Sequence, residues 1–307
     1  MSMNTYAPIA VFVYNRPEKT RAMIGSLASC KLARESELIV FSDGAKNEEA
    51  AGPVNETREY IDTLSSLGYF KEVSVYKSDK NKGLAASVIS GITDVLNRYG
   101  RVITVEDDLL FSEGFLEYMN KCLDCYENDD RIWSVSGFTP QLHRGSYYKD
   151  VYLSYRASSW GWGTWKSKWD MVDWEVGDYG SFKYDPIGNL RFCRGGNDLP
   201  SMLRAQMKGN INSWAVRWCY AQSRRNMYTV YPVVSLVSNN GLDGTGTHSK
   251  EEDSIRYAAG LGDADDLQCC YDDLKPDRHM LWEFYKIYHL GLWVRIRDKI
   301  KQLMSRN

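Results

Sequence analysis

Short apolar stretches and longer stretches with helical spacing alternate through the first hundred residues. Three helical stretches are expected, one beginning at Pro17, one capped by Asn55 and one over residues 84–99. The apolar stretches are typical of buried strands and cover residues 9–14, 38–41, 73–76 and 101–105. Strands joined by helices are the order of a parallel sheet, so we predict an α/β, Rossmann-like fold whose mostly parallel sheet is flanked by helices.

Polar residues follow each of the four predicted strands. In open sheets of this kind, ligands bind outside the carboxyl ends of the strands, so we expect these residues to face one crevice. They are Asn15 and Arg16 after the first strand, Ser42, Asp43 and Gly44 after the second, Asp79, Lys80, Asn81, Lys82 and Gly83 after the third, and Glu106, Asp107 and Asp108 after the fourth.

The three consecutive acids at the end of the fourth strand are the sharpest signal. Neighbouring carboxylates repel each other and lose hydration at a strand end, so such a triplet usually holds a cation or a hydrogen-bonded ligand. The alternative is that these acids only close the strand and cap a following helix, because Ser112 and Glu113 are typical of a helix start.

Several function classes lack their motifs. The chain has neither a GxGxxG after the first strand nor a GxxxxGK[ST], which argues against a dinucleotide fold and a P-loop. A formal net charge of -2 gives no general attraction to nucleic acid. A nucleotide would therefore be held by acids and a metal.

Cysteine usage and hydropathy predict a cytoplasmic protein. No apolar run reaches the length of a membrane span, and residues 1–10 lack a basic start. Seven cysteines without an export signal favour reduced thiols. Cys122 and Cys125 form a CxxC within a helical stretch, where they would be two small apolar groups on one face. Zinc is the weaker interpretation, since only Cys269 and Cys270 could complete the site.

The chain becomes rich in Trp, Tyr and Gly after residue 136, so we divide it into a nucleotide-binding half, about 1–136, and an acceptor half, about 137–250. Five of the ten tryptophans lie between residues 160 and 174. Flat rings stack on sugars, so we expect Trp160, Trp162 and Trp214 to bind the acceptor. For any single tryptophan, core packing is the alternative.

The last seventy residues contain three further features. A glycine-rich loop over 238–250, with Asp243 and His248, is typical of a lid. An acidic linker follows from residue 251. The tail to residue 307 carries apolar residues at helical spacing among basic ones. Such a helix can lie on an anionic membrane, here the inner face of the plasma membrane, or dock on the protein's own core.

With these residues in view, the chain resembles nucleotide-sugar glycosyltransferases of the GT-A fold, and within them the N-acetylglucosaminyltransferase I type, over about residues 8–249. The resemblance rests on Asn15-Arg16-Pro17, Ser42-Asp43-Gly44, Asn81-Lys82-Gly83 and the Glu106-Asp107-Asp108 variant of the DxD motif. It implies transfer of a sugar, with inversion, from a UDP-linked donor to a saccharide or lipid-linked saccharide in bacterial-type surface polysaccharide or glycan assembly.

The resemblance also implies roles for individual residues. Asp43 would hydrogen-bond the base, Asp107 would lie near the ribose or sugar, and Arg16 near the diphosphate. Asp108 would bind Mn²⁺ or Mg²⁺, and His248 would reach the metal from the closing loop. The remaining residues expected at the nucleotide sugar are Asn15, Asn81, Lys82 and Glu106.

The chain departs from that family at the catalytic base. Inverting relatives place a carboxylate between two tryptophans at a helix start, and the matching segment here, residues 214–218, has none. Asp198 is our leading substitute because it follows two glycines and precedes a helix. Plain N-capping is the alternative for Asp198, and Asp243 and Asp173 are further candidates.

Two other functions are compatible with this fold. A sugar-nucleotide pyrophosphorylase would need a glycine-rich basic loop after the first strand, where this chain has Asn15-Arg16-Pro17-Glu18. A catalytically silent sugar-binding or scaffold protein would explain the missing base, but it leaves the intact acidic triplet without a purpose.

Overall fold

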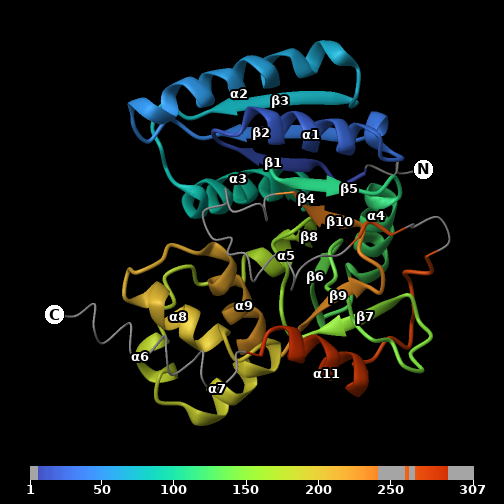
Figure 1. Ribbon diagram of the computed structural model, residues 1–307. Coiled ribbons are helices and arrows are strands. Elements are labelled where there is room, and N and C mark those ends of the chain that lie inside the picture. Colours follow the sequence, from blue (N-terminus) through green and yellow to red (C-terminus); the bar gives the residue numbers. More distant parts are fainter. Residues whose placement is uncertain (1–5, 241–259, 263–266, 290–307) are drawn as a thin grey trace.

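A twisted eight-stranded sheet forms the centre of the computed structural model, which describes residues 6–240, 260–262 and 267–289. The strand order is β3-β2-β1-β4-β8-β6-β9-β7 (Figure 1). The pairs β2-β3, β1-β2, β1-β4 and β6-β9 are parallel, and the other three are antiparallel. The strands are β1 (Ile9–Val13), β2 (Glu37–Ser42), β3 (Glu72–Lys77), β4 (Arg101–Glu106), β6 (Ile132–Ser136), β7 (Val151–Ser154), β8 (Trp162–Trp165) and β9 (Tyr228–Pro232).

Helices cover both faces of this sheet, and a small ribbon of β5 (Leu109–Phe111) and β10 (Val237–Asn239) lies beside it. The α-helices are α1 (Pro17–Ala28), α2 (Glu48–Leu67), α3 (Leu84–Tyr99), α4 (Phe115–Tyr126), α5 (Lys166–Trp169), α6 (Tyr179–Phe182), α7 (Pro186–Phe192), α8 (Leu199–Met207), α9 (Trp214–Arg224) and α11 (Arg278–Ile287). Two 3₁₀ turns are η1 (Ala33–Glu35) and η2 (Cys193–Gly195). The predicted α/β class with a mostly parallel sheet is confirmed.

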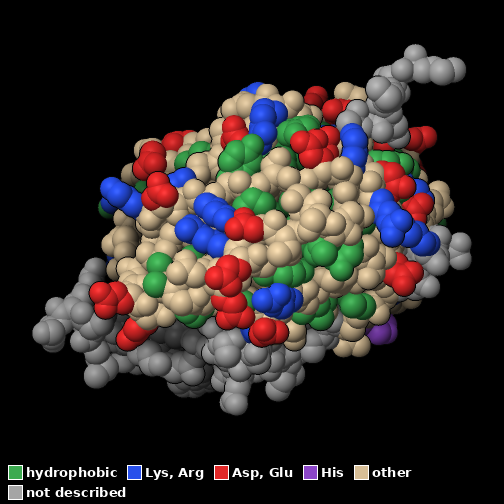
Figure 2. Space-filling view, turned by 90° about the horizontal axis from the view of Figure 1, so that it is seen from above, with side chains coloured by type: hydrophobic (Ala, Val, Ile, Leu, Met, Phe, Trp, Pro, Cys, Tyr) green, Lys and Arg blue, Asp and Glu red, His purple; other side chains and the backbone are tan. Residues whose placement is uncertain are grey.

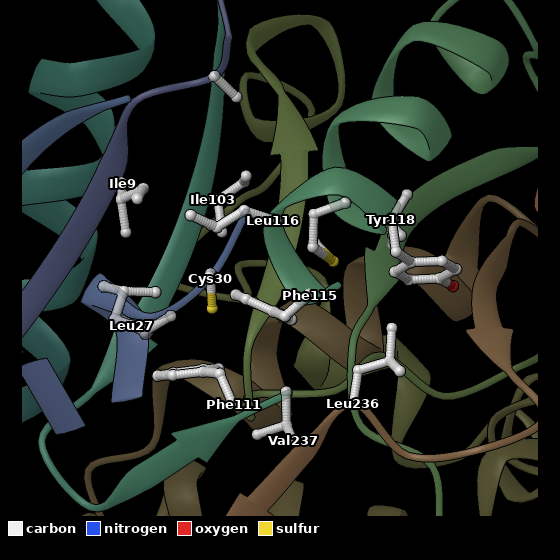
Figure 3. Packing of buried hydrophobic residues seen from close by; sticks show 14 of the residues in the cluster. Ile9, Leu27, Cys30, Ile103, Phe111, Phe115, Leu116, Tyr118, Leu236 and Val237 are labelled. Atoms are coloured by element: carbon white, nitrogen blue, oxygen red, sulfur yellow. The ribbon is translucent and has the colours of Figure 1, made fainter. Parts of the chain in front are cut away.

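Successive side chains of a strand point to opposite faces of the sheet, and each face packs against its own apolar core. In β1, Ile9, Val11 and Val13 face one core, while Ala10 and Phe12 face the other. Helices α1, α2 and α4 pack in the first core and α3, α8 and α9 in the second. Figure 3 shows where α1, α4 and the β5-β10 ribbon meet in the first core. The strands are therefore fixed from both sides, and their carboxyl ends form a rigid edge.

One local prediction is wrong, and one alternative is excluded. Helix α2 is capped by Asn47, whose side chain accepts a hydrogen bond from the Ala50 N–H at 3.1 Å, and not by Asn55. The helix therefore begins eight residues earlier, where Asn47 can satisfy a free N–H group. The acidic triplet is followed by β5 and not by a helix, because residues 109–111 pair with β10. A helix-capping role for the triplet is thus excluded.

The C-terminal part of the described chain docks on the sheet. Met280 and Phe284 of α11 are buried against Tyr152 and Tyr231. Within the described ranges, no helix has both the length and the apolar character that crossing a membrane requires. On the described part of the face in Figure 2, Lys and Arg are interspersed with Asp and Glu. The predicted basic tail lies outside the described residues.

Candidate active site

One large cavity, of about 1540 Å³, lies at the carboxyl ends of β1, β2, β3 and β4. It confirms that the polar strand ends meet at one edge of the sheet. The predicted residues that line it are Asn15, Arg16, Asp43, Asn81, Lys82, Glu106, Asp107, Asp108, Trp160 and Trp214. Their individual roles remain predictions. His248 lies outside the described residues.

Asp43 organises the side of the cavity formed by the ends of β2 and β3. Its carboxylate accepts hydrogen bonds from the N–H groups of Gly44 at 2.9 Å, Lys82 at 2.9 Å and Gly83 at 2.8 Å. A side chain on Gly44 would place Cβ 2.6 Å from the backbone of Lys80, so only glycine fits there. Asp43 thereby fixes the entry to α3, and most of its acceptor capacity is already used.

Arg16 faces the acidic triplet from the end of β1. Its Nη1 lies 3.1 Å from Asp108 Oδ2 and 3.4 Å from Asp107 Oδ1. The other Asp108 oxygen, Oδ1, is buried and accepts no hydrogen bond from the described residues. A buried carboxylate oxygen without a donor is costly, so a cation, a water molecule or a donor from a ligand or from residues outside the described ranges would stabilise it.

The triplet is short of positive charge. Burial, followed by the neighbouring charges of Asp108 and Asp107, raises the pKa of Glu106 to about 8, and Arg16 only partly opposes this. Burial also raises the pKa of Asp107 to about 6, with Arg16 again opposing. The Arg16 guanidinium, which the charge of Lys19 assists at Asp107, therefore does not fully compensate the three carboxyl groups.

These carboxylates fit a divalent cation. Mn²⁺ and Mg²⁺ prefer oxygen ligands, and Asp108 Oδ1 is a buried acceptor that such an ion would satisfy. Within residues 6–240, 260–262 and 267–289, no three His, Cys, Asp or Glu side chains form a complete ligand set. The other ligands would have to be phosphate oxygens of a substrate, water or residues outside those ranges.

The tryptophans divide between the cavity wall and the core. Trp160 lines the cavity and packs edge-on against Phe138 at 4.6 Å between ring centroids. Trp214 also lines it, with 3% of its surface exposed. Trp162 is fully buried, does not line the cavity and stacks on Trp214 at 5.1 Å. The prediction that Trp162 binds the acceptor is therefore wrong, because neighbouring rings cover it.

The same packing accounts for most of the tryptophan-rich segment. The buried tryptophans are Trp133, Trp162, Trp165, Trp169, Trp214 and Trp218. Most of them form one continuous stack that joins β8, α5 and α9. Core packing, the alternative for a single tryptophan, is thus the role of the majority.

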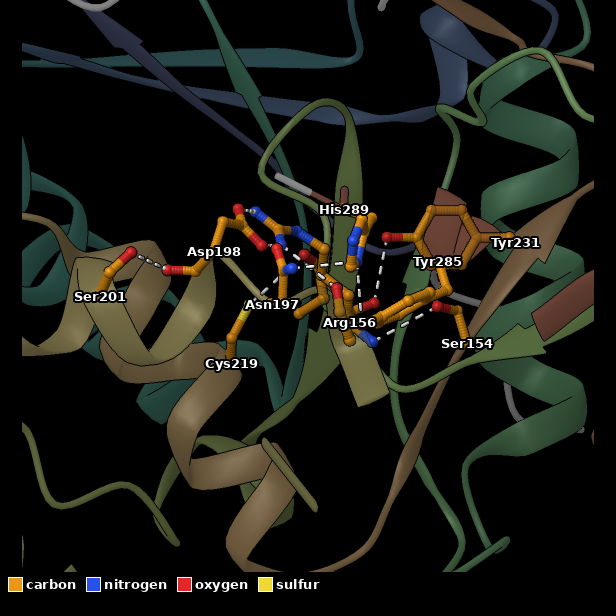
Figure 4. A network of polar contacts seen from close by, with 11 residues as sticks. Ser154, Arg156, Asn197, Asp198, Ser201, Cys219, Tyr231, Tyr285 and His289 are labelled. Carbon is orange, nitrogen blue, oxygen red and sulfur yellow. Dashed lines mark hydrogen bonds and ion pairs between the residues drawn. The ribbon is translucent and has the colours of Figure 1, made fainter. Parts of the chain in front are cut away.

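Asp198 is held by Arg156 in the network of Figure 4. Arg156 Nη1 donates to Asp198 Oδ1 at 2.8 Å and Nη2 donates to Oδ2 at 3.0 Å. Asp198 occupies the cap position of α8, but its side chain makes no capping hydrogen bond. The carboxylate is absent from the cavity lining, whereas Arg156 is part of it. An acceptor hydroxyl would have to replace a guanidinium N–H to reach Asp198.

The other carboxylate candidates are placed differently. Asp173 accepts hydrogen bonds from the N–H groups of Glu175 at 3.0 Å and Gly177 at 2.7 Å, so it stabilises a turn. Asp243 lies outside the described residues. The structure therefore assigns no catalytic base.

Two arginines of the site could not be found from the sequence. The Arg156 side chain is only 13% exposed, and its guanidinium lies 4.0 Å from the ring centroid of Tyr288, which also lines the cavity. Burial opposes the charge of Arg156, but Asp198 and Tyr288 raise its pKa above the ordinary value. Arg58 donates to Ser42 Oγ at 3.1 Å and to the Ser78 carbonyl at 2.6 Å, which fixes the ends of β2 and β3. Their partners are distant in sequence, so no local pattern signals them.

Comparisons with known proteins give only distant structural likeness. No family model and no curated protein matches the chain. A crystal structure of S. aureus TarS is 14% identical, with a TM-score of 0.35 over 50% of this chain and 25% of TarS.

Two shorter TarS structures give similar values. A crystal structure of TarS residues 1–349 is 11% identical, with a TM-score of 0.39 over 74% of this chain and 60% of that one. The same piece in complex with UDP-GlcNAc is 16% identical, with a TM-score of 0.29 over 42% and 33%. The chain thus spans between a quarter and three fifths of the structures that it resembles.

Proposed function

We propose that this protein is a metal-dependent glycosyltransferase, which moves a sugar from a UDP-linked donor to a saccharide or lipid-linked saccharide acceptor. The observation that carries the proposal is the buried, unpaired Oδ1 of Asp108 beside the Arg16 guanidinium, at the floor of a large cavity. A carboxylate with a free oxygen and an adjacent cationic side chain are suited to a cation and the diphosphate that it accompanies.

The acidic turn after β4 would hold the cation. Asp108 offers Oδ1 directly, and Asp107 could contribute the oxygen that now faces Arg16. The chemistry that Mn²⁺ or Mg²⁺ supplies at such a site is neutralisation of the nucleoside diphosphate as the leaving group. The pKa values of Glu106 and Asp107 are raised first by burial and then by repulsion from Asp108, so a bound cation would favour the ionised carboxylates there.

Residues of the chain would orient the rest of the donor. Arg16 can form charge-assisted hydrogen bonds to phosphate oxygens once the acids have a second counter-charge. Lys82 and Gly83 present the beginning of α3 to the same cavity, where the helix dipole favours anions. Asp43 keeps that helix start in place.

The cavity is large enough for two substrates. Pockets for one small ligand usually measure roughly 300–1,000 Å³, and this cavity of about 1540 Å³ exceeds that range. Trp160 and Trp214 both line the cavity, Trp160 just before β8, which is the neighbour of β4 in the sheet. We propose that the acceptor sugar packs against these rings.

Turnover of nucleotide sugars by the purified chain tests this function. UDP-GlcNAc, UDP-glucose and UDP-galactose are each incubated with Mn²⁺ or with EDTA, and release of UDP is measured. We expect Mn²⁺-dependent release from at least one donor, and a loss of about 100-fold or more in Asp108→Asn. The matched control is Glu59→Gln, an exposed acid on α2.

A second candidate is a catalytically silent sugar-binding protein, which the pairing of Asp198 with Arg156 favours. In that case UDP-sugars bind but none is turned over, with or without Mn²⁺. Turnover that is equal in EDTA and Mn²⁺ would refute the metal-dependent proposal.

A further inference from the structure

Three strongly exposed apolar side chains lie on helix α7 and on the turn before it. They are Tyr184, Ile187 and Leu190, with exposed fractions of 78%, 63% and 70%. Among the large hydrophobic side chains of the described residues, they are three of the four most exposed, and they fall within residues 184–190. Single exposed apolar residues are ordinary on a protein surface, whereas a group of them usually marks a binding surface. We call these three residues the α7 patch.

The buried side of α7 explains why the patch faces outward. Phe192 of α7 and Phe182 of α6 pack against Tyr220 of α9, with ring centroids 5.6 Å and 4.7 Å from that ring. Asp185 caps α7 by accepting a hydrogen bond from the Gly188 N–H at 2.9 Å. The α7 patch is therefore held on the outside of a packed and capped helix.

Basic side chains flank the α7 patch. Lys183 and Arg191 are exposed, and Lys183 Nζ lies 4.7 Å from the ring centroid of Tyr184. Arg194 is half-buried, with its guanidinium 3.9 Å from the ring centroid of Tyr155. Aromatic and aliphatic side chains with lysine and arginine beside them are the combination that binds at the boundary between lipid headgroups and acyl chains.

The acids of the same region do not cancel this charge. Asp178 and Asp185 are the two acids between residues 178 and 194, and both lie near Arg224 of α9, at 3.2 Å and 3.9 Å from its nitrogens. With Arg224 included, the region carries four basic side chains and two acidic ones. This excess of two positive charges contrasts with the formal net charge of -2 of the whole chain, and it favours a negatively charged partner.

We propose that the α7 patch docks this protein on a membrane surface that contains anionic phospholipids. The apolar side chains of the patch enter the interface, where they leave water. Lys183 and Arg191 contact the phosphate groups of the lipids around them. The partner is therefore a lipid surface, recognised through apolar contact and positive charge together.

The patch lies close to the acceptor side of the cavity. Helix α7 contacts α8 and α9, and both of these helices contribute to the cavity lining, for example through Met202 and Trp214. In Figure 1, α7 lies at the lower end of the molecule, whereas α2 and β3 lie at the upper end. Docking through α7 would turn the acceptor side of the cavity toward the membrane. This orientation suits a lipid-linked acceptor, a step that rests on the proposed function.

Binding of the purified full chain to vesicles tests the proposal. Sedimentation is measured with vesicles of phosphatidylcholine alone and of an equal mixture of phosphatidylcholine and phosphatidylglycerol, without nucleotide sugar. We expect binding to the mixed vesicles that weakens as salt is raised, because salt screens the basic side chains. The double variant Ile187→Gln, Leu190→Gln should weaken this binding at least about tenfold. The control Leu67→Gln, at an exposed position on α2, should leave it unchanged.

Hydrogen exchange of the parent chain gives a second measurement that needs no variant. Mixed vesicles should slow amide exchange in residues 183–194 and leave residues 60–70 unchanged. The proposal is overturned if the parent does not bind mixed vesicles, or if the double variant binds them as tightly as the parent. Protection of residues 183–194 by a second copy of the chain, without vesicles, would also overturn it. Because neither substrate is present, a chain that binds vesicles through α7 but releases no UDP in the turnover assay would refute only the proposed function.

Discussion

Replacing Asp108 by asparagine removes one negative charge from the acidic turn while nearly preserving the size of the side chain. The residue is a sensitive place to do so, because its side chain is only 13% exposed and its Oδ1 is buried without a partner in the described part of the chain. If the turn binds a divalent cation, the affinity for UDP in the presence of Mn²⁺ should fall, and the affinity in EDTA should stay nearly unchanged.

The size of that effect can be estimated from the electrostatics of the site. Two unit charges about 4 Å apart near a protein surface interact by about 4 kcal/mol. Asp107 stays in place and asparagine retains one oxygen, so we expect a net loss of about 2–3 kcal/mol, or roughly 30- to 150-fold in the dissociation constant of UDP with Mn²⁺.

Stability should respond differently from binding. Arg16 loses one partner at 3.1 Å but keeps Asp107 at 3.4 Å. Removing the Asp108 charge also relieves one of the causes that raise the pKa of Glu106. The two effects oppose each other, so the free energy of unfolding without metal should change by less than about 1 kcal/mol.

Calorimetric titration of UDP into the parent, Asp108→Asn and the exposed control Glu59→Gln, each with Mn²⁺ and with EDTA, measures these effects. An Asp108→Asn variant that binds UDP and Mn²⁺ as tightly as the parent would refute the assignment. So would a parallel loss in EDTA, since that result would indicate damage to the cavity and not loss of a ligand to the metal.

Three further experiments separate structural roles from binding roles. Gly44→Ala should cost about 1–3 kcal/mol of stability in chemical denaturation, because its Cβ would lie 2.6 Å from a neighbouring backbone atom. In the control Gly52→Ala, the new Cβ meets nothing within 4 Å, so this change should be neutral or stabilising. Equal free energies of unfolding for the two variants would contradict the close approach at Gly44. Trp162→Ala should lower the free energy of unfolding by about 3–5 kcal/mol, because the ring is fully buried. Trp160→Ala should mainly weaken acceptor binding, because this ring lines the cavity. If Trp160→Ala lost the stability and Trp162→Ala the acceptor binding, the assignment of Trp160 to the cavity wall would be refuted. Asp198→Asn should lower turnover by about 10²–10⁴-fold if Asp198 is the base, and near-parent turnover with reduced thermal stability would assign it a structural role.

The sheet and its functional edge were predictable because they depend on local patterns. Apolar strands of β1 to β4 alternate with helices of 3.6-residue periodicity, and this order determines a parallel sheet with its carboxyl ends together. The polar residues after those strands then had to meet, and Arg16, Asp43 and Asp108 do line one cavity. No partner from a distant part of the chain was needed for that inference.

Features that depend on distant contacts were not predictable. Trp162 has the same local setting as Trp160, two residues away, yet one is covered by α9 and the other borders the cavity. Cys125 of α4 is far in sequence from Cys269 and Cys270, and only the packing of residues 267–274 against α4 places the three on one surface hollow. Sequence spacing cannot reveal either outcome, because both depend on which elements become neighbours.

The carboxylates show how the same residue type acquires different roles from its surroundings. Asp43 is satisfied by three backbone N–H groups and Asp198 by both terminal nitrogens of one arginine, so each has its acceptors largely occupied by the protein. Asp108 shares a guanidinium with Asp107 and has one oxygen left over. A ligand that brings positive charge therefore gains most at Asp108, whereas at Asp43 or Asp198 it would first have to displace existing hydrogen bonds. This difference in remaining acceptor capacity, and not the presence of acids alone, is what distinguishes the proposed metal ligand from the acids that hold the fold.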